Sequence, residues 1–388
     1  MKRQAHPIAI YSILVFLVFS LTSSFAAKAE SAKSLNETMV SIGYTMEGLF
    51  PILFDKQEAD KKQQQQLTDS VEKLIVLFDR SKPHINAKSP TYRISFDVIK
   101  TQLTHARSAN KYKNFNYTKS ILKDITSVCA SCHTQDTKIR TLFPNIKRDA
   151  FGSDYEYAEF SYMTRNYKTA VEYLTKFLDA NTEVDEAELL SIMKQMITIY
   201  IQIYYQPDDA IALLNRLNKY KHHTKFSKKT LEEWLAGIAE LKKDKDSLKT
   251  IKNIDQLNIE VHKILGELSE PGSAQFPNKR ERIARLWLRG ALYHYLNSRP
   301  PREEVPIILY WLAIVDRSIN FSVYYSLSDM YLKECVLKYT SHPYAQKCFD
   351  EYKENIILSY SGSRGTDIPE DIQNELNALQ LRIKGVPN

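Results

Sequence analysis

Glycine and proline are scarce in this chain, which has 10 Gly and 14 Pro among 388 residues. These two residues supply most tight turns, so their scarcity argues against a fold built from many short strands. Aromatic residues, in contrast, make up 11% of the chain and can fill a large core. We therefore predict an all-α protein with long helices.

The chain also lacks a strong charge imbalance and the familiar catalytic motifs. Its formal net charge is +7, and the basic residues are scattered rather than clustered, which argues against a nucleic-acid partner. No G-x-S-x-G, P-loop or H-E-x-x-H motif occurs, and no Ser-His-Asp set stands out. The sequence thus favours a carrier or binding protein over an enzyme.

Long hydrophobic runs are absent except near the start of the chain. A short basic segment, Met1-Lys2-Arg3, precedes an apolar stretch from Ile8 to Phe19, and Ala27–Ala29 forms a small-x-small cleavage site. This pattern predicts a signal peptide over residues 1–29, with an uncleaved anchor as the alternative. We expect a periplasmic protein without a stable membrane span after cleavage.

Cysteine is rare, with four residues, and two of them stand in the motif Cys129-Ala130-Ser131-Cys132-His133. C-x-x-C-H is the attachment signature of c-type haem. The two thiols form thioethers with the haem vinyl groups, and the histidine supplies an axial iron ligand. On a helix, positions i, i+3 and i+4 share one face and can meet one flat macrocycle. The motif predicts one covalently bound haem c.

A C-x-x-C pair can also belong to a zinc site or to a redox dithiol. A zinc site needs two further ligands, and the remaining cysteines, Cys335 and Cys348, lie about 200 residues away. A thioredoxin-like dithiol needs a neighbouring βαβ pattern, whereas the flanking sequence is helical in pattern. Both roles fit less well than haem attachment.

Residues 30–145 show four amphipathic segments with short connections, which predicts an antiparallel four-helix bundle. Apolar residues recur at steps of three and four in each segment. The expected helices cover residues 32–54, 60–80, 91–110 and 117–142, with Pro51 bending the first and the C-x-x-C-H motif on the last.

With this motif late in the fourth helix, the domain resembles the cytochrome c prime and cytochrome c-556 family. In the first helix, Met39, Met46 and Pro51-Ile52-Leu53 match the register of the family's distal-side positions. The resemblance implies that Met39 occupies the sixth position of the iron and that Met46 lines the haem pocket. The tyrosine-arginine pairs that the family carries near both sites are missing here.

Other groups compete for a role near the haem. His84 and His105 are alternative sixth ligands. Lys119 and Lys123 precede the motif on the same helix and could form a basic rim that steers a redox partner, or belong to an ordinary solvated face.

Residues 150–388 show a different pattern, of helical hairpins at intervals that resemble tetratricopeptide repeats. The positions that carry the repeat packing are Ala158, Tyr167, Ala170, Leu174 and Phe177; Ile201, Ala210, Leu214 and Leu217; Trp287, Gly290, Ala291, Val305, Leu309 and Leu312; and Leu332, Ala345, Phe349 and Tyr352. Such units bury their faces only by stacking, so we predict a TPR-like α-solenoid. Cys335 and Cys348 flank the last turn and are expected to form a disulfide.

These features predict an exported mono-haem cytochrome that transfers electrons, with the repeat domain docking a redox or scaffold protein. Two alternatives stay open. The haem could bind or sense NO or CO, or it could be a structural group on a periplasmic scaffold.

Overall fold

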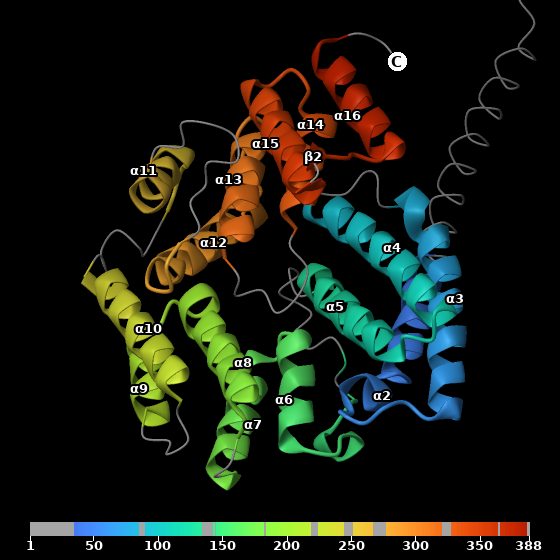
Figure 1. Cartoon of the computed structure of the whole chain (residues 1–388), viewed down its shortest axis with the longest axis vertical. Helices are drawn as coiled ribbons and strands as arrows, with labels where there is room; N and C mark the ends of the chain where they lie inside the picture. Colours follow the sequence, from blue (N-terminus) through green and yellow to red (C-terminus); the bar gives the residue numbers. More distant parts are fainter. Residues whose placement is uncertain are drawn as a thin grey trace, which may run out of the picture. The chain divides into compact units, whose positions relative to one another are not determined.

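The computed structural model describes residues 35–84, 90–133, 143, 145–181, 184–218, 224–243, 251–266, 277–319, 327–363 and 365–385. Over these residues the chain is all-α, as predicted, apart from two strands of two residues each (Figure 1). These strands, β1 (Ser361–Gly362) and β2 (Gly365–Thr366), pair antiparallel. The predicted signal peptide lies outside the described residues.

The first helical elements begin within a few residues of the predicted segments, but the first segment is split into two helices, and the predicted end of the fourth at residue 142 lies outside the described residues. A helix over residues 35–47 is followed by α2 (Phe50–Phe54), α3 (Lys61–Ser81), the short 3-10 helix η1 (Lys82–His84), α4 (Pro90–Lys111) and α5 (Phe115–His133).

The remaining elements form a second series, which the structure gives as η2 (Arg148–Ala150), α6 (Asp154–Met163), α7 (Tyr167–Ala180), α8 (Glu186–Ile197), η3 (Thr198–Ile203), α9 (Pro207–Leu217), α10 (Lys225–Lys243), α11 (Ile254–Leu265), α12 (Glu281–Asn297), α13 (Val305–Ser318), α14 (Ser328–Lys338), α15 (Pro343–Ser359) and α16 (Glu370–Ile383).

Proline and capping residues explain where the early helices begin and end. Pro51 lies in the first turn of α2, where no hydrogen bond within the helix needs its missing N–H. The preceding helix therefore ends before Pro51, and α2 begins as a separate helix. Asp60 caps α3 by accepting from the Gln63 N–H, and the Gln63 side chain accepts from the Asp60 N–H in return. This reciprocal capping box fixes the start of α3.

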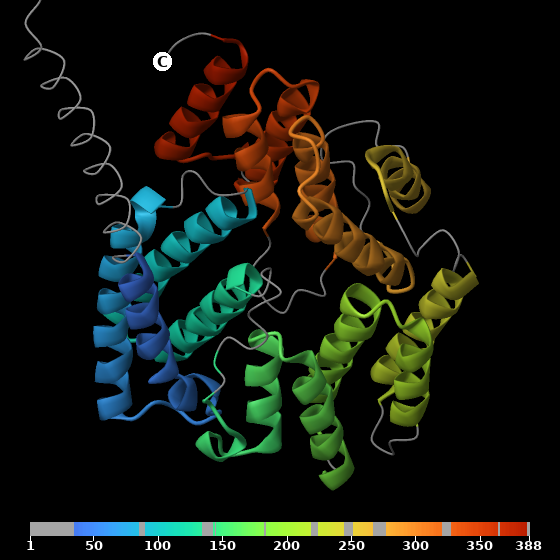
Figure 2. The same ribbon diagram turned by 180° about the vertical axis from the view of Figure 1, so that it is seen from behind.

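Several polar contacts set the directions of the early helices. Arg107 on α4 pairs with Glu72 on α3, and Lys100 pairs with Asp79 at 2.7 Å, so the two helices run antiparallel. Gln66 donates to the Gly48 carbonyl at 2.9 Å, which ties the start of α3 to the end of the first helix. The side-by-side placement of α3 and the first helix can be followed in Figure 2.

The chain divides into two compact units, but the division does not fall at a loop. One unit comprises Met1–Ser89 with Lys100–Leu122, and the other Pro90–Ile99 with Lys123–Asn388. The division between the two units therefore runs through the middle of α4 and of α5. The predicted boundary between residues 145 and 150 lies inside the second unit.

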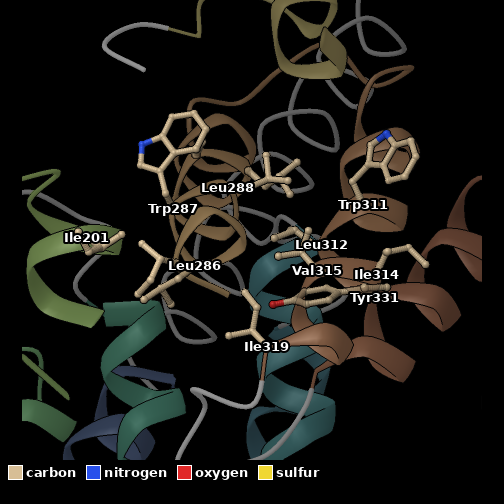
Figure 3. Packing of buried hydrophobic residues seen from close by; sticks show 14 of the residues in the cluster. Ile201, Leu286, Trp287, Leu288, Trp311, Leu312, Ile314, Val315, Ile319 and Tyr331 are labelled. Atoms are coloured by element: carbon tan, nitrogen blue, oxygen red, sulfur yellow. The ribbon is translucent and has the colours of Figure 1, made fainter. Parts of the chain in front are cut away.

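Within the second unit, helical hairpins follow one another along the chain. α6 packs on α7, α12 on α13, and α14 on both α13 and α15. The predicted repeat positions are buried, with Tyr167 and Phe177 half-buried. In Figure 3, Leu286 and Leu288 of α12 and Leu312 and Val315 of α13 share one hydrophobic cluster.

Two glycines allow helices in this unit to approach closely. A Cβ on Gly290 of α12 would lie 2.5 Å from the Gln202 carbonyl oxygen of η3, and one on Gly237 of α10 would lie 2.6 Å from the Arg280 carbonyl oxygen. Gln202 belongs to a turn of π-helix, a wider winding that often accompanies local constraints. Any larger residue at either glycine would push the backbones apart.

The Sγ atoms of Cys335 on α14 and Cys348 on α15 lie at disulfide distance, as predicted, with 6.3 Å between the Cα atoms. Both residues are fully buried. Among the helices that the structure describes, none has the length and apolar composition to cross a membrane.

Candidate functional site

Helix α5 positions the C-x-x-C-H motif. Asn114, in the turn before α5, accepts from the Tyr117 N–H at 3.2 Å and so caps the first turn. Ile121, Leu122 and Ile125 are fully buried and fix how the helix is rotated about its axis. Because the helix continues unbroken to His133, Cys129, Cys132 and His133 stand at i, i+3 and i+4 of one α-helix.

Two residues of the motif, Cys129 and His133, lie neither at the protein surface nor sealed in the core. Cys129 and His133 are half-buried, while the side chain of Cys132 lies outside the described part of the structure. Burial lowers the pKa of the His133 imidazole below its usual value, which favours the neutral form that binds metals. The preceding Ala130 is fully buried.

The position of the motif on α5 argues against a reactive dithiol. Cys129 lies 14 residues, about four turns, after the start of the helix. The helix dipole stabilises a thiolate only within the first turn. The cysteines therefore lack the helix N-terminus that lowers thiol pKa values in dithiol redox motifs.

The other two cysteines are not available as zinc ligands. Cys335 and Cys348 are paired with each other and belong to the α14–α15 hairpin. Across the described residues, no three side chains of His, Cys, Asp or Glu gather in a way that could hold a metal ion.

The two methionines of the first helix differ in burial. Met39 is half-buried in the helix over residues 35–47, and Met46, two turns further on, is 2% exposed. Met46 thus lies in the core of the first unit, next in sequence to the buried Thr45. Met39 keeps access to a group outside that core.

The competing histidines have different environments. His105 is exposed on α4, and His84 is half-buried in η1, at the end of α3. Neither residue stands on the helix of the C-x-x-C-H motif, and both stay predicted alternatives for the sixth ligand.

The two lysines of α5 are not part of a solvated face. Lys119 is 7% exposed, and its Nζ donates to the carbonyl oxygens of Asp55 and Gln57, the latter at 2.9 Å. Lys123 forms an ion pair with Glu159 of α6 at 2.9 Å. Both alternatives, a basic rim and an ordinary solvated face, are therefore wrong for these residues, since both lysines serve internal contacts. Periodicity alone could not show this.

Asp124 is a polar group on α5 that the sequence pattern did not single out. It is half-buried, and its Oδ1 has no hydrogen-bond partner among the described residues. Burial raises the pKa of this carboxyl to about 7, and the charge of Lys123 opposes the rise only in part. A carboxyl among apolar residues of a helix is the only signal that sequence could have offered.

Comparison of the chain with protein-family models, with curated proteins and with solved structures finds no match.

Proposed function

We propose that this protein is an exported mono-haem c-type cytochrome that transfers electrons. The observation that carries the proposal is the placement of Cys129, Cys132 and His133 at i, i+3 and i+4 of α5. A C-x-x-C-H sequence on one helix face is the arrangement that two thioethers and one axial ligand require.

The residues present fit this group. The Cys129 and Cys132 thiols would hold the haem covalently, and the His133 imidazole, half-buried and favoured in its neutral form, would bind the iron. When bound, the haem supplies one-electron oxidation and reduction. The chain's own contribution is to anchor the group, to restrict water around it and to fix the imidazole.

The register of the first helix supports Met39 as the sixth ligand, since Met39 falls on the distal position of the cytochrome c prime and c-556 family that the sequence resembles. Met39 is half-buried in the helix over residues 35–47.

The contacts in the first unit also support the antiparallel bundle of the cytochrome c prime and c-556 type. The pairs Glu72–Arg107 and Asp79–Lys100 make α3 and α4 antiparallel, and the Gln66 contact ties the first helix to α3. A methionine in the distal position would give His-Met ligation and a raised reduction potential.

The proposed location and partners depend on segments outside the C-x-x-C-H motif. The signal-peptide pattern of residues 1–29 supports export to the periplasm, the compartment in which bacteria attach haem c. The helical hairpins after residue 150, which resemble TPR units, would dock the redox or scaffold partner.

Absorption and EPR spectra of the oxidised and reduced secreted protein test the proposal. Electron transfer predicts low-spin haem in both redox states with Met39 in place. Five-coordinate ferrous haem that binds NO readily would instead favour the gas-binding alternative, and loss of Cys129 and Cys132 without loss of partner binding or redox phenotype would favour a structural haem.

A further inference from the structure

A second polar cluster lies within the second unit, distant in sequence from the C-x-x-C-H motif. Its members come from four different helices and one turn. We call it the Arg289 cluster, and it consists of Tyr162, Arg165, Arg289, Tyr293, Asp316 and Tyr331.

Arg289 stands at the centre of this cluster with its hydrogen-bonding capacity only partly used. Its Nη1 lies 3.2 Å from Oδ1 of Asp316, and the two side chains are 15% and 4% exposed. Asp316 also accepts from the Leu327 N–H at 2.7 Å. The Arg289 Nε atom is buried and has no hydrogen-bond partner in the part of the chain that the structure describes. A buried N–H donor without a hydrogen-bond partner lowers the stability of the fold, and a bound acceptor would remove this cost.

Tyrosine hydroxyls surround the same guanidinium. Tyr293 on α12 and Tyr331 on α14 share a hydrogen bond between their hydroxyls, and Tyr162 on α6 shares one with Thr198. Burial raises the pKa of Tyr162 to about 12, and burial likewise raises the pKa values of Tyr293 and Tyr331. All three phenols thus stay protonated. Because one of Tyr293 and Tyr331 donates to the other, the second keeps a hydrogen to donate.

Arg165 adds a second positive charge from the turn between α6 and α7. Its charge acts on the phenols of Tyr162 and Tyr293 and opposes the burial that raises their pKa values. The residue is half-buried, and within the described residues its guanidinium forms no ion pair. With two guanidinium groups against the single carboxylate of Asp316, the cluster carries an excess of about one positive charge.

We propose that the Arg289 cluster binds a monoanionic organic carboxylate. Planar guanidinium groups and phenolic hydroxyls are the donors that match a carboxylate, and one negative charge balances the excess. A phosphate dianion fits less well, because Asp316 would repel its second charge. Tyr162, Arg165, Arg289 and Tyr293 each keep part of their surface exposed to solvent.

Neighbouring rings indicate an apolar body on the ligand. Tyr167 packs edge-on against Tyr162, with 6.0 Å between ring centroids, and against Tyr204 at 6.5 Å. Tyr204 is 39% exposed and offers aromatic surface beside the charged groups. The carboxylate can belong to a free small molecule or to the C-terminus of a peptide, since both present the same chemistry. This inference does not depend on the haem.

Binding of benzoate to the full secreted chain tests the proposal, with calorimetry as the readout. We expect saturable binding by the wild type, at least a tenfold loss of affinity in Arg165→Gln, and no binding of neutral benzamide. Arg216→Gln is the matched control, because Arg216 pairs with Asp179 on an exposed surface of the same unit and should leave benzoate binding unchanged. Tyr162→Phe, which removes one hydroxyl with little effect on packing, should also weaken binding.

Three results would overturn the proposal: no saturable benzoate binding up to about 10 mM, equal affinity in the wild type and both arginine variants, or tighter binding of inorganic phosphate than of benzoate. A peptide that ends in phenylalanine separates the two sources of carboxylate. If the peptide binds more tightly than benzoate, and amidation of its C-terminus abolishes this binding, the site is assigned to a peptide C-terminus. If the peptide binds more weakly than benzoate, the site is assigned to a free small molecule.

Discussion

At the scale of single residues, Asp124 is the side chain on α5 whose environment is least expected. Its raised pKa of about 7 means that the native state keeps a proton that the unfolded chain releases near pH 4. Between these values the native state binds more protons, so the free energy of unfolding falls as pH rises. Asp124→Asn removes the charge and should abolish this fall, which amounts to about 4 kcal/mol at most.

Urea unfolding of both proteins between pH 4 and pH 8 measures this difference. Asp69→Asn, on the exposed side of α3, is the control and should follow the wild type. Identical pH profiles for the wild type and Asp124→Asn would show that Asp124 does not keep its proton in the native state.

Met39 and Met46 should respond differently to substitution. Met39→Ala removes the proposed sixth ligand and should convert low-spin haem to a high-spin or five-coordinate form, seen in the absorption and EPR spectra. Met46→Leu keeps the volume of a buried core residue and should leave the spin state unchanged, at a stability cost below about 1.5 kcal/mol. A low-spin spectrum retained by Met39→Ala would remove Met39 from the site.

At the scale of helices, two glycines in similar helical settings should behave in opposite ways. Gly43 has open space where a Cβ would stand, so Gly43→Ala should stabilise its helix by about 1 kcal/mol. Gly290→Ala would bring a Cβ to 2.5 Å from the Gln202 carbonyl and should destabilise the protein by about 1–3 kcal/mol. Thermal unfolding of both variants checks whether the first is stabilised and the second destabilised. Unchanged stability of Gly290→Ala would contradict the close approach of α12 and η3.

The α14–α15 hairpin should depend on its disulfide. Cys335 and Cys348 are 13 residues apart, and a loop of this length corresponds to about 3 kcal/mol of unfolded-state entropy. The double variant Cys335→Ala/Cys348→Ala should therefore unfold at a lower temperature than the wild type in the absence of reductant. Non-reducing peptide mapping that finds both thiols unmodified would contradict the bridge.

Helices were predictable from the sequence because their signals are local. The periodic apolar residues, the cap at Asp60 and the proline at position 51 each act within a few residues of the helix end that they determine. Contacts across the sequence were not predictable in this way. The charge of Lys119 suggests a surface residue. Its Nζ instead donates hydrogen bonds to carbonyl oxygens of residues more than 60 positions away in the sequence.

The same reason limits what sequence reveals of functional groups. The C-x-x-C-H motif is visible in the sequence because its chemistry lies within five consecutive residues. Arg289 and Asp316 look like ordinary charged residues of two separate helices, and only the packing of α12 on α13 brings them together. The desolvation of Asp124 is likewise a property of the fold.

At the scale of the whole molecule, α4 belongs to both compact units, which predicts that residues 30–145 do not form an independent domain. Ile94 and Val98 of α4 belong to the same buried cluster as the helices of the second unit. A fragment of residues 30–145 would expose this surface and should bind the dye ANS and be cleaved rapidly by protease. A fragment as resistant to protease as the full chain would contradict this prediction.

The central claim is that Cys129, Cys132 and His133 hold one covalently bound haem, and intact-mass spectrometry of the secreted protein after acid-acetone extraction tests it most directly. We expect a mass equal to the mature chain plus one haem, and the mass of the chain alone for Cys129→Ala/Cys132→Ala. A wild-type protein, produced with haem-attachment machinery present, that shows only the mass of the polypeptide would contradict the claim.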